Sequence, residues 1–204
     1  STLMASALIS SATVPVFSNL ITPSARTLKK GIMWGSIGVG KTIMEKFQAA
    51  KEAGFDGVEP MSHLNRKEVL AARDATGLII ASVCGELHWK YPLSDPDPKI
   101  RELGVETLKV TIEDAGVYGA DTVLLVPGIV NETVSYDQCW NRCIEEIRKV
   151  IPMAEKLKVK IALENVWNNF LISPMEAASY VDQFKSPYIG WYFDCGNILV
   201  YGWP

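Results

Sequence analysis

The sequence predicts a partial TIM (β/α)8 barrel of about six β/α units, and three observations support this fold class. Short β-rich runs alternate with helical patterns, which is typical of βαβ units in a parallel sheet. Polar residues stand at or just after the ends of four different strands, as in barrel enzymes, whereas a doubly wound sheet gathers its ligand contacts at one switch point. The 204 residues fall short of the roughly 250 of a typical complete barrel, so we expect the last two strands beyond Pro204.

The elements follow one another in a regular order. Strands are expected at 31–34, 57–60, 78–84, 122–126, 160–164 and 188–194. Helices are expected at 42–53, 66–76, 99–118, 135–157 and 174–184. Gly54 and Gly77 end the first two helices as glycines after a last turn do, and Pro174 opens the last helix in its first turn. The run 78–84 is continuously apolar and β-rich, which indicates a strand buried on both faces.

Composition excludes several classes of protein. A net charge of −3 gives no basic surface for nucleic acid, and 48% hydrophobic against 21% charged residues is ordinary for a globular domain. The four cysteines form no C-x-x-C pair, and Cys139 and Cys143 are expected to be buried thiols on one helix. His63 and His88 are the only histidines of the sequence, so a site with three imidazoles is excluded within it. We place His63 in a loop or in solvent.

Residues 1–28 are set apart from the barrel domain, which we assign to 29–204. The run 3–17 is apolar, uncharged, rich in small residues and too short to span a bilayer. It resembles the end of an export signal peptide whose basic region lies upstream, and the alternative is a short N-terminal extension. We therefore expect an exported, periplasmic protein, with the cytoplasm as the alternative, and no membrane span in the body of the chain.

The segment Gly35–Thr42 matches the phosphate-binding pattern G-x-x-x-x-G-K-[ST] in full. Its glycine-rich backbone could cradle phosphates, with Lys41 reaching the terminal one. The preceding strand is very short, however, and no residue is placed to position water or to neutralise a leaving phosphate. A P-loop nucleotide-binding protein is therefore kept as an alternative function only.

Two carboxylates carry the favoured chemistry. Glu164 ends the fifth expected strand and Asp194 ends the sixth. An ionised carboxylate at the end of a buried strand is costly unless a cation or a partner receives it. Two of them on neighbouring strands indicate a hard divalent metal, Mn²⁺ or Mg²⁺, with Zn²⁺ or Co²⁺ as alternatives. Helix capping is the other interpretation, and it explains Asp194 better than Glu164.

Four segments, taken in order and spacing, resemble the sugar phosphate isomerase/epimerase family of the xylose isomerase-like TIM barrels. They are Gly57-Val58-Glu59, Gly119-Ala120-Asp121-Thr122-Val123, Ala162-Leu163-Glu164-Asn165 and Phe193-Asp194-Cys195-Gly196-Asn197. The likeness runs from about residue 30 to 204. The segments 88–94 and 164–168 resemble the branch near the ketose 3-epimerases and the hexulose- and pentulose-phosphate isomerases and epimerases.

The resemblance implies a metal held by four residues, which end strands five to eight of the barrel. Glu164 and Asp194 match the glutamate and aspartate of strands five and six, and the other two ligands would lie beyond Pro204. In the ketose epimerases the metal-bound glutamates also act as the acid/base pair, which makes Glu164 a candidate catalytic residue. The sequence as it stands is therefore expected to be inactive alone. Asn197 replaces a histidine that many relatives carry, which argues against endonuclease chemistry.

Five further residues are candidates for substrate contact: His88, Trp89, Glu59, Asn197 and Trp34. His88 would bond a sugar hydroxyl or carbonyl, and Trp89 would stack on the carbon chain. The alternative is a loop histidine bonded to backbone beside a packed indole. Glu59 would contact substrate or pair with a neighbour, and Trp34 would line the pocket wall.

The favoured function is a metal-dependent isomerase or epimerase of a sugar or sugar phosphate that acts through an enediolate. The alternatives are the nucleotide-binding protein and a sugar-binding barrel without chemistry. The expected partner is a small-molecule sugar or sugar phosphate, with no nucleic acid. A partial barrel exposes an unpaired edge, so association into a homo-oligomer is a further expectation.

Overall fold

Six parallel strands with helices outside them form the framework of the molecule, whose computed structural model describes residues 28–202. The strands are β1 (Gly31–Met33), β2 (Gly57–Glu59), β3 (Ser82–Cys84), β4 (Thr122–Leu125), β5 (Lys160–Glu164) and β6 (Ile189–Tyr192). The helices are the 3-10 turn η1 (Trp34–Ser36), α1 (Ile43–Glu52), α2 (Arg66–Thr76), α3 (Pro98–Tyr118), α4 (Tyr136–Arg148), α5 (Ile151–Leu157), α6 (Pro174–Asp182) and α7 (Cys195–Val200). The run 3–17, interpreted above as part of an export signal, lies outside the described residues.

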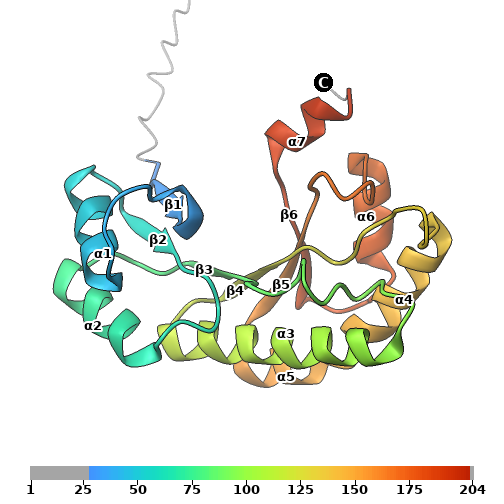
Figure 1. Ribbon diagram of the computed structural model, residues 1–204, viewed down its shortest axis with the longest axis horizontal. Helices are drawn as coiled ribbons and strands as arrows, with labels where there is room; N and C mark the ends of the chain where they lie inside the picture. The colour runs from blue at the N-terminus through green and yellow to red at the C-terminus, as the bar shows by residue number, and fades with distance from the viewer. Residues whose placement is uncertain (1–27, 203–204) are drawn as a thin grey trace, which may run out of the picture.

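The strands follow one another in space in the order of the chain. β1 pairs with β2, and β3, β4, β5 and β6 form a second ladder, with every pairing parallel. Single parallel bridges from Gly57 to Ile79 and from Met61 to Cys84 join β2 to β3. Figure 1 shows the resulting trough, with β1 and β6 at its two rims and α3 and α5 on its convex side. The predicted partial barrel of six units is confirmed.

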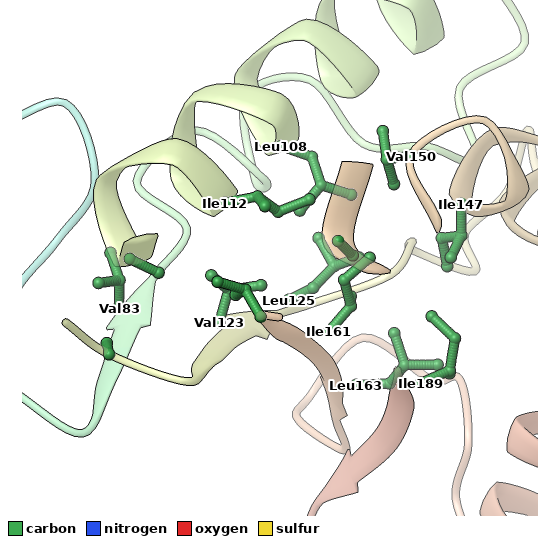
Figure 2. Close-up of a cluster of buried hydrophobic side chains, with 14 of the residues drawn as sticks. Val83, Leu108, Ile112, Val123, Leu125, Ile147, Val150, Ile161, Leu163 and Ile189 are labelled. Carbon is green, nitrogen blue, oxygen red and sulfur yellow. The ribbon is translucent and has the colours of Figure 1, made fainter. Parts of the chain in front are cut away.

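Alternate residues of each strand face opposite sides of this curved sheet. Val123, Leu125, Ile161 and Leu163 face the helices and are at most 3% exposed. Figure 2 shows them packed with the apolar side chains of the helical layer, which include Leu108, Ile112, Ile147 and Val150. On the concave side, Cys84, Leu124 and Tyr192 form a separate small apolar cluster. Period-two alternation thus divides the strands into a core face and a face that lines the interior of the barrel.

Helix ends follow the expected chemistry, with one difference. Gly54 and Gly77 adopt the positive φ angles expected after the helices that they end. The single helix predicted for 135–157 is two helices, α4 and α5. Pro152 lies in the first turn of α5, where its missing N–H costs nothing. Inside one continuous helix its ring would clash with the carbonyl of Arg148.

Three further elements differ from the predictions. The 3-10 turn η1 was not predicted as an element, and it begins at the last residue expected for the first strand. The third strand is paired as a ladder only over Ser82–Cys84, and Ile79 makes an isolated bridge. The short helix α7 was not predicted as an element, and it begins because Asp194 caps it. Cys139 and Cys143 are fully buried, as predicted. Among the described residues, the structure contains no helix with the length and apolar character needed to cross a membrane.

Candidate active site

Three carboxylates from strand ends meet around one cavity. Glu59 is the last residue of β2, Glu164 is the last residue of β5, and Asp194 follows β6 by two positions. All three line a cavity of about 570 Å³, together with inward-facing residues of β1 and β3. This volume is typical of sites for small molecules. Parallel strands bring their carboxyl ends to one rim, which is where barrel enzymes place their chemistry.

Glu164 has the fewest hydrogen bonds of the three carboxylates. Burial and, to a smaller extent, the negative charges of Asp194 and Glu59 together raise the pKa of its carboxyl to about 7. Within residues 28–202 no group donates a hydrogen bond to this carboxylate. A half-buried carboxylate without donors favours a proton or a cation as its partner.

Asp194 has one oxygen in use. Its Oδ1 accepts a hydrogen bond of 2.9 Å from the backbone N–H of Asn197, which caps α7. Helix capping therefore explains part of the role of Asp194, as the alternative interpretation held. Its Oδ2 accepts no hydrogen bond from the described residues. The negative charge of Asp194 contributes to the raised pKa of Glu164, which shows that the two groups interact.

The donor set fits a hard divalent cation in part. Both groups are carboxylates, the ligands that Mg²⁺ and Mn²⁺ prefer, and both face one cavity. In the described part of the chain, no group of three or more His, Cys, Asp or Glu side chains is placed to hold a metal ion. Two carboxylates leave most of the six positions of such an ion to water and to other ligands.

Asn165, which was not among the predicted site residues, ties the ends of β5 and β6 together. Its Oδ1 accepts hydrogen bonds from Trp191 Nε1 at 2.8 Å and from Asp194 N at 3.2 Å. Its Nδ2 donates to the carbonyl of Asp194 at 3.1 Å, and its own carbonyl accepts from Asn197 Nδ2 at 2.7 Å. The side chain is fully buried. Asn197, predicted as a substrate contact, is therefore one of the hydrogen-bonded residues that fix the backbone beside Glu164. We call this group the clamp; its members are Asn165, Trp191, Asp194 and Asn197.

Glu59 is held by two hydroxyl donors, neither of which was predicted. Ser82 Oγ on β3 donates to Glu59 Oε1 at 2.6 Å, and Tyr192 OH on β6 donates to the same oxygen at 3.0 Å. Burial raises the pKa of Glu59 and outweighs these two hydrogen bonds, which act to lower it. The only sign of these two donors in the sequence is their position along the strands, where alternation points their side chains into the barrel.

The remaining candidates lie elsewhere. The ring of His88 is buried, its pKa is lowered to about 4 by that burial, and its Nδ1 accepts from the backbone N–H of Val126 at 3.4 Å. Trp89 packs edge-on against His88 and is 49% exposed. Trp34 packs against Phe47 and under the ammonium group of Lys46. None of the three predicted residues lines the cavity, and His88 matches the alternative of a loop histidine bonded to backbone.

His63 is exposed in the loop before α2, as expected.

The P-loop-like segment has a different role from phosphate binding. The carboxylate of Glu45 accepts hydrogen bonds from the backbone N–H groups of Lys41 at 2.6 Å and Thr42 at 3.0 Å. These are amides that a phosphate would need. Thr42 Oγ1 in turn accepts from Glu45 N, which completes a capping box at the start of α1. The strand before the segment pairs only with β2 within the described chain, so the arrangement does not fit a P-loop.

The fold and the site together define a class, a parallel β/α barrel with acidic side chains at the carboxyl ends of its strands. The family model described as xylose isomerase-like TIM barrel matches residues 47–204. The chain belongs to this family.

Comparison with individual proteins agrees with this membership. The chain is 26% identical over 187 residues to the L-ribulose-5-phosphate 3-epimerase UlaE of Escherichia coli K12, an alignment that covers 85% of the chain and 66% of that relative. Among solved structures it is similar to an L-ribulose 3-epimerase (TM-score 0.72, 22% identity, 84% and 62% covered). It is also similar to the 3-keto-D-glucoside 4-epimerase YcjR of E. coli (TM-score 0.70, 22% identity, 79% and 66% covered). The chain thus spans about two thirds of the length of these proteins.

Proposed function

We propose that the whole protein is an isomerase or epimerase of a sugar or sugar phosphate, which abstracts a proton next to a carbonyl and passes through an enediolate. The observation that carries this proposal is the carboxylate of Glu164, which ends β5 in the cavity without a hydrogen-bond donor from residues 28–202 and has a pKa raised to about 7. A general base works best when its pKa lies near the working pH, because it is then both unprotonated and basic. In the metal-free protein Glu164 meets that condition near neutrality.

In this mechanism Glu164 takes the proton from the carbon beside the carbonyl. Its burial strengthens it as a base, because the charged form is poorly solvated and gains by accepting a proton. Asn165 fixes the backbone on which Glu164 and Asp194 stand, so that the base keeps its position relative to the substrate. A second acid/base group would return the proton to the carbon.

We infer that Glu164 and Asp194 also hold a divalent cation, Mn²⁺ or Mg²⁺, with Zn²⁺ or Co²⁺ as alternatives. When bound there, the cation would supply positive charge opposite the enediolate oxygens. The two negative charges that raise the pKa of Glu164 in its absence support such a site.

The names of the similar proteins support a ketose as substrate. One relative acts on L-ribulose 5-phosphate and another on L-ribulose. The proposal therefore includes both phosphorylated and free ketoses.

The test follows hydrogen exchange at carbon in the whole protein. With a ketose, Mn²⁺ and D₂O, we expect deuterium to enter the substrate at the carbon beside the carbonyl, as seen by proton NMR. Glu164→Gln should lower the exchange rate by about a thousandfold or more, since it removes the base. Glu145→Gln, an exposed glutamate of α4, is the matched control and should leave exchange unchanged. Normal exchange in Glu164→Gln would contradict the proposal.

A further inference from the structure

A hydrogen-bonded group of three side chains crosses the interior of the barrel. Tyr192 on β6 reaches Glu59 on β2, which stands near the opposite rim of the trough in Figure 1, and donates to its Oε1 at 3.0 Å. Ser82 on β3 donates to the same oxygen at 2.6 Å. We call Ser82, Glu59 and Tyr192 the interior triad.

The triad lies where the packed interior of the barrel meets the rim of the carboxyl ends. Polar residues are common at that rim, but Glu59 is a carboxylate that is only 8% exposed. Burying a carboxylate costs free energy that apolar packing would not. Conflicts of this kind with the ordinary rules of packing concentrate at functional sites.

The two donors leave one oxygen of Glu59 free for a ligand. Both bonds go to Oε1, and Oε2 has no partner among residues 28–202. Glu59 lines the same cavity as Glu164 and Asp194. Because Oε1 is fixed from two sides, the plane and direction of the carboxylate are set before a ligand arrives, which lowers the cost of binding.

The charges around the cavity limit what Oε2 can bind. Glu59, Glu164 and Asp194 are all acidic, so a phosphate or carboxylate group placed among them would be repelled. The cationic residues that line the cavity, Lys29 and Lys30, precede β1 and so belong to the opposite, amino end of the strands. A hydroxyl group, which can donate a hydrogen bond and carries no charge, fits this position.

We propose that Glu59 accepts a hydrogen bond from a substrate hydroxyl, and that Tyr192 and Ser82 are positioning residues that aim its carboxylate at that hydroxyl. The inference rests on the proposed function for the identity of the ligand as a sugar. It adds that the part of the sugar next to β2 carries a free hydroxyl, so that any phosphate of the substrate lies elsewhere.

The test uses the whole protein with Mn²⁺ and three variants, Glu59→Gln, Tyr192→Phe and Ser82→Ala. L-ribulose and D-fructose serve as substrates for kcat and KM, and ribitol, which has no carbonyl and cannot react, serves as a binding probe in calorimetry. Tyr118→Phe is the matched control, because it also removes a buried phenol hydroxyl but lies on α3, away from the cavity. Thermal unfolding of each variant shows whether it is folded.

We expect Tyr192→Phe and Ser82→Ala to raise KM and to weaken ribitol binding about fivefold to tenfold, the size of the loss of one typical hydrogen bond. Their kcat should change less than about threefold, since neither residue touches the reacting carbon. Glu59→Gln should show at least the same loss. The double variant Glu59→Gln with Tyr192→Phe should be no weaker than Glu59→Gln alone, because Tyr192 acts through Glu59.

The outcomes separate this inference from the proposed function. Weaker ribitol binding in the variants, without proton exchange in the wild-type protein, would support the triad and contradict the proposed reaction. Normal exchange in the wild type, with KM and ribitol affinity unchanged in the folded variants, would overturn the triad and leave the reaction standing. A protein that neither exchanges the proton nor binds any of the three probes would overturn both.

Discussion

The raised pKa of Glu164 makes the stability of the metal-free protein depend on pH. The pKa rises from the ordinary 4.5 to about 7 in the folded protein, first because of burial and then because of Asp194 and Glu59. The folded protein therefore binds this proton more tightly than the unfolded chain does. The stabilisation is complete below about pH 4.5 and is lost as the pH rises through about 7.

The size of the effect follows from the shift. At about 1.36 kcal/mol per pKa unit, the full shift corresponds to roughly 3 kcal/mol. Because the carboxyl group is still partly exposed, solvent screening reduces this to roughly 1–2 kcal/mol. Glu164→Gln, which keeps the shape and carries no charge, should therefore match the wild type near pH 4.5 and be more stable by roughly 1–2 kcal/mol at pH 8.

Urea unfolding at pH 4.5, 6 and 8 in the presence of a chelator measures this difference. Glu145→Gln, on the exposed side of α4, should show no such dependence on pH and serves as the control. An equal difference between Glu164→Gln and wild type at all three pH values would refute the account of Glu164 as a desolvated carboxylate.

Three further predictions concern the clamp, the capping box and the core. Asn165→Ala removes three hydrogen bonds of a buried side chain and should lower the free energy of unfolding by roughly 2–4 kcal/mol. The control Asn141→Ala, at an exposed position, should change it by less than about 0.5 kcal/mol in the same urea titration. Glu45→Ala should lower the free energy of unfolding, because it removes one half of the capping box. Calorimetry with ATP should detect no binding to wild type, since Glu45 already bonds these amides; ATP binding at micromolar affinity would contradict this. Leu163→Ala should cost roughly 2–5 kcal/mol, because Leu163 is fully buried against the helices, and Leu199→Ala, 64% exposed, is its control.

Much of the fold could be predicted because the strands carry a period-two pattern and glycines and prolines mark the helix ends. Gly77 ends α2 in the left-handed conformation as predicted, and all six strands occur in parallel. The break between α4 and α5 was missed although Pro152 signals it, because apolar residues continue the helical period across it. At that position the restriction that proline places on a continuous helix outweighs the apolar periodicity.

The candidate site was predictable only where a strand ended in a charge. Glu59, Glu164 and Asp194 were found in this way, and they line one cavity. The donors Ser82 and Tyr192 were missed because they act across the barrel, and a contact between residues 133 positions apart leaves no local pattern.

The polar and aromatic residues of the loops were predicted in the same way, and the structure does not place them at the cavity. His88 and Trp89 follow a strand as active-site residues do, yet the ring of His88 turns into the protein and bonds the backbone of Val126. Whether a loop side chain faces the cavity depends on the path of the loop. The phase of the preceding strand does not determine that path.

The central claim is that Glu164 and Asp194 share one divalent cation, and Mn²⁺ binding to the whole protein tests it most directly. Electron paramagnetic resonance would measure free Mn²⁺ during titration of the wild type, Glu164→Gln, Asp194→Asn and the control Glu145→Gln. The account predicts one site per chain in wild type and control, and at least about tenfold weaker binding in each of the other two variants. Unchanged Mn²⁺ affinity in folded Glu164→Gln and Asp194→Asn would contradict it.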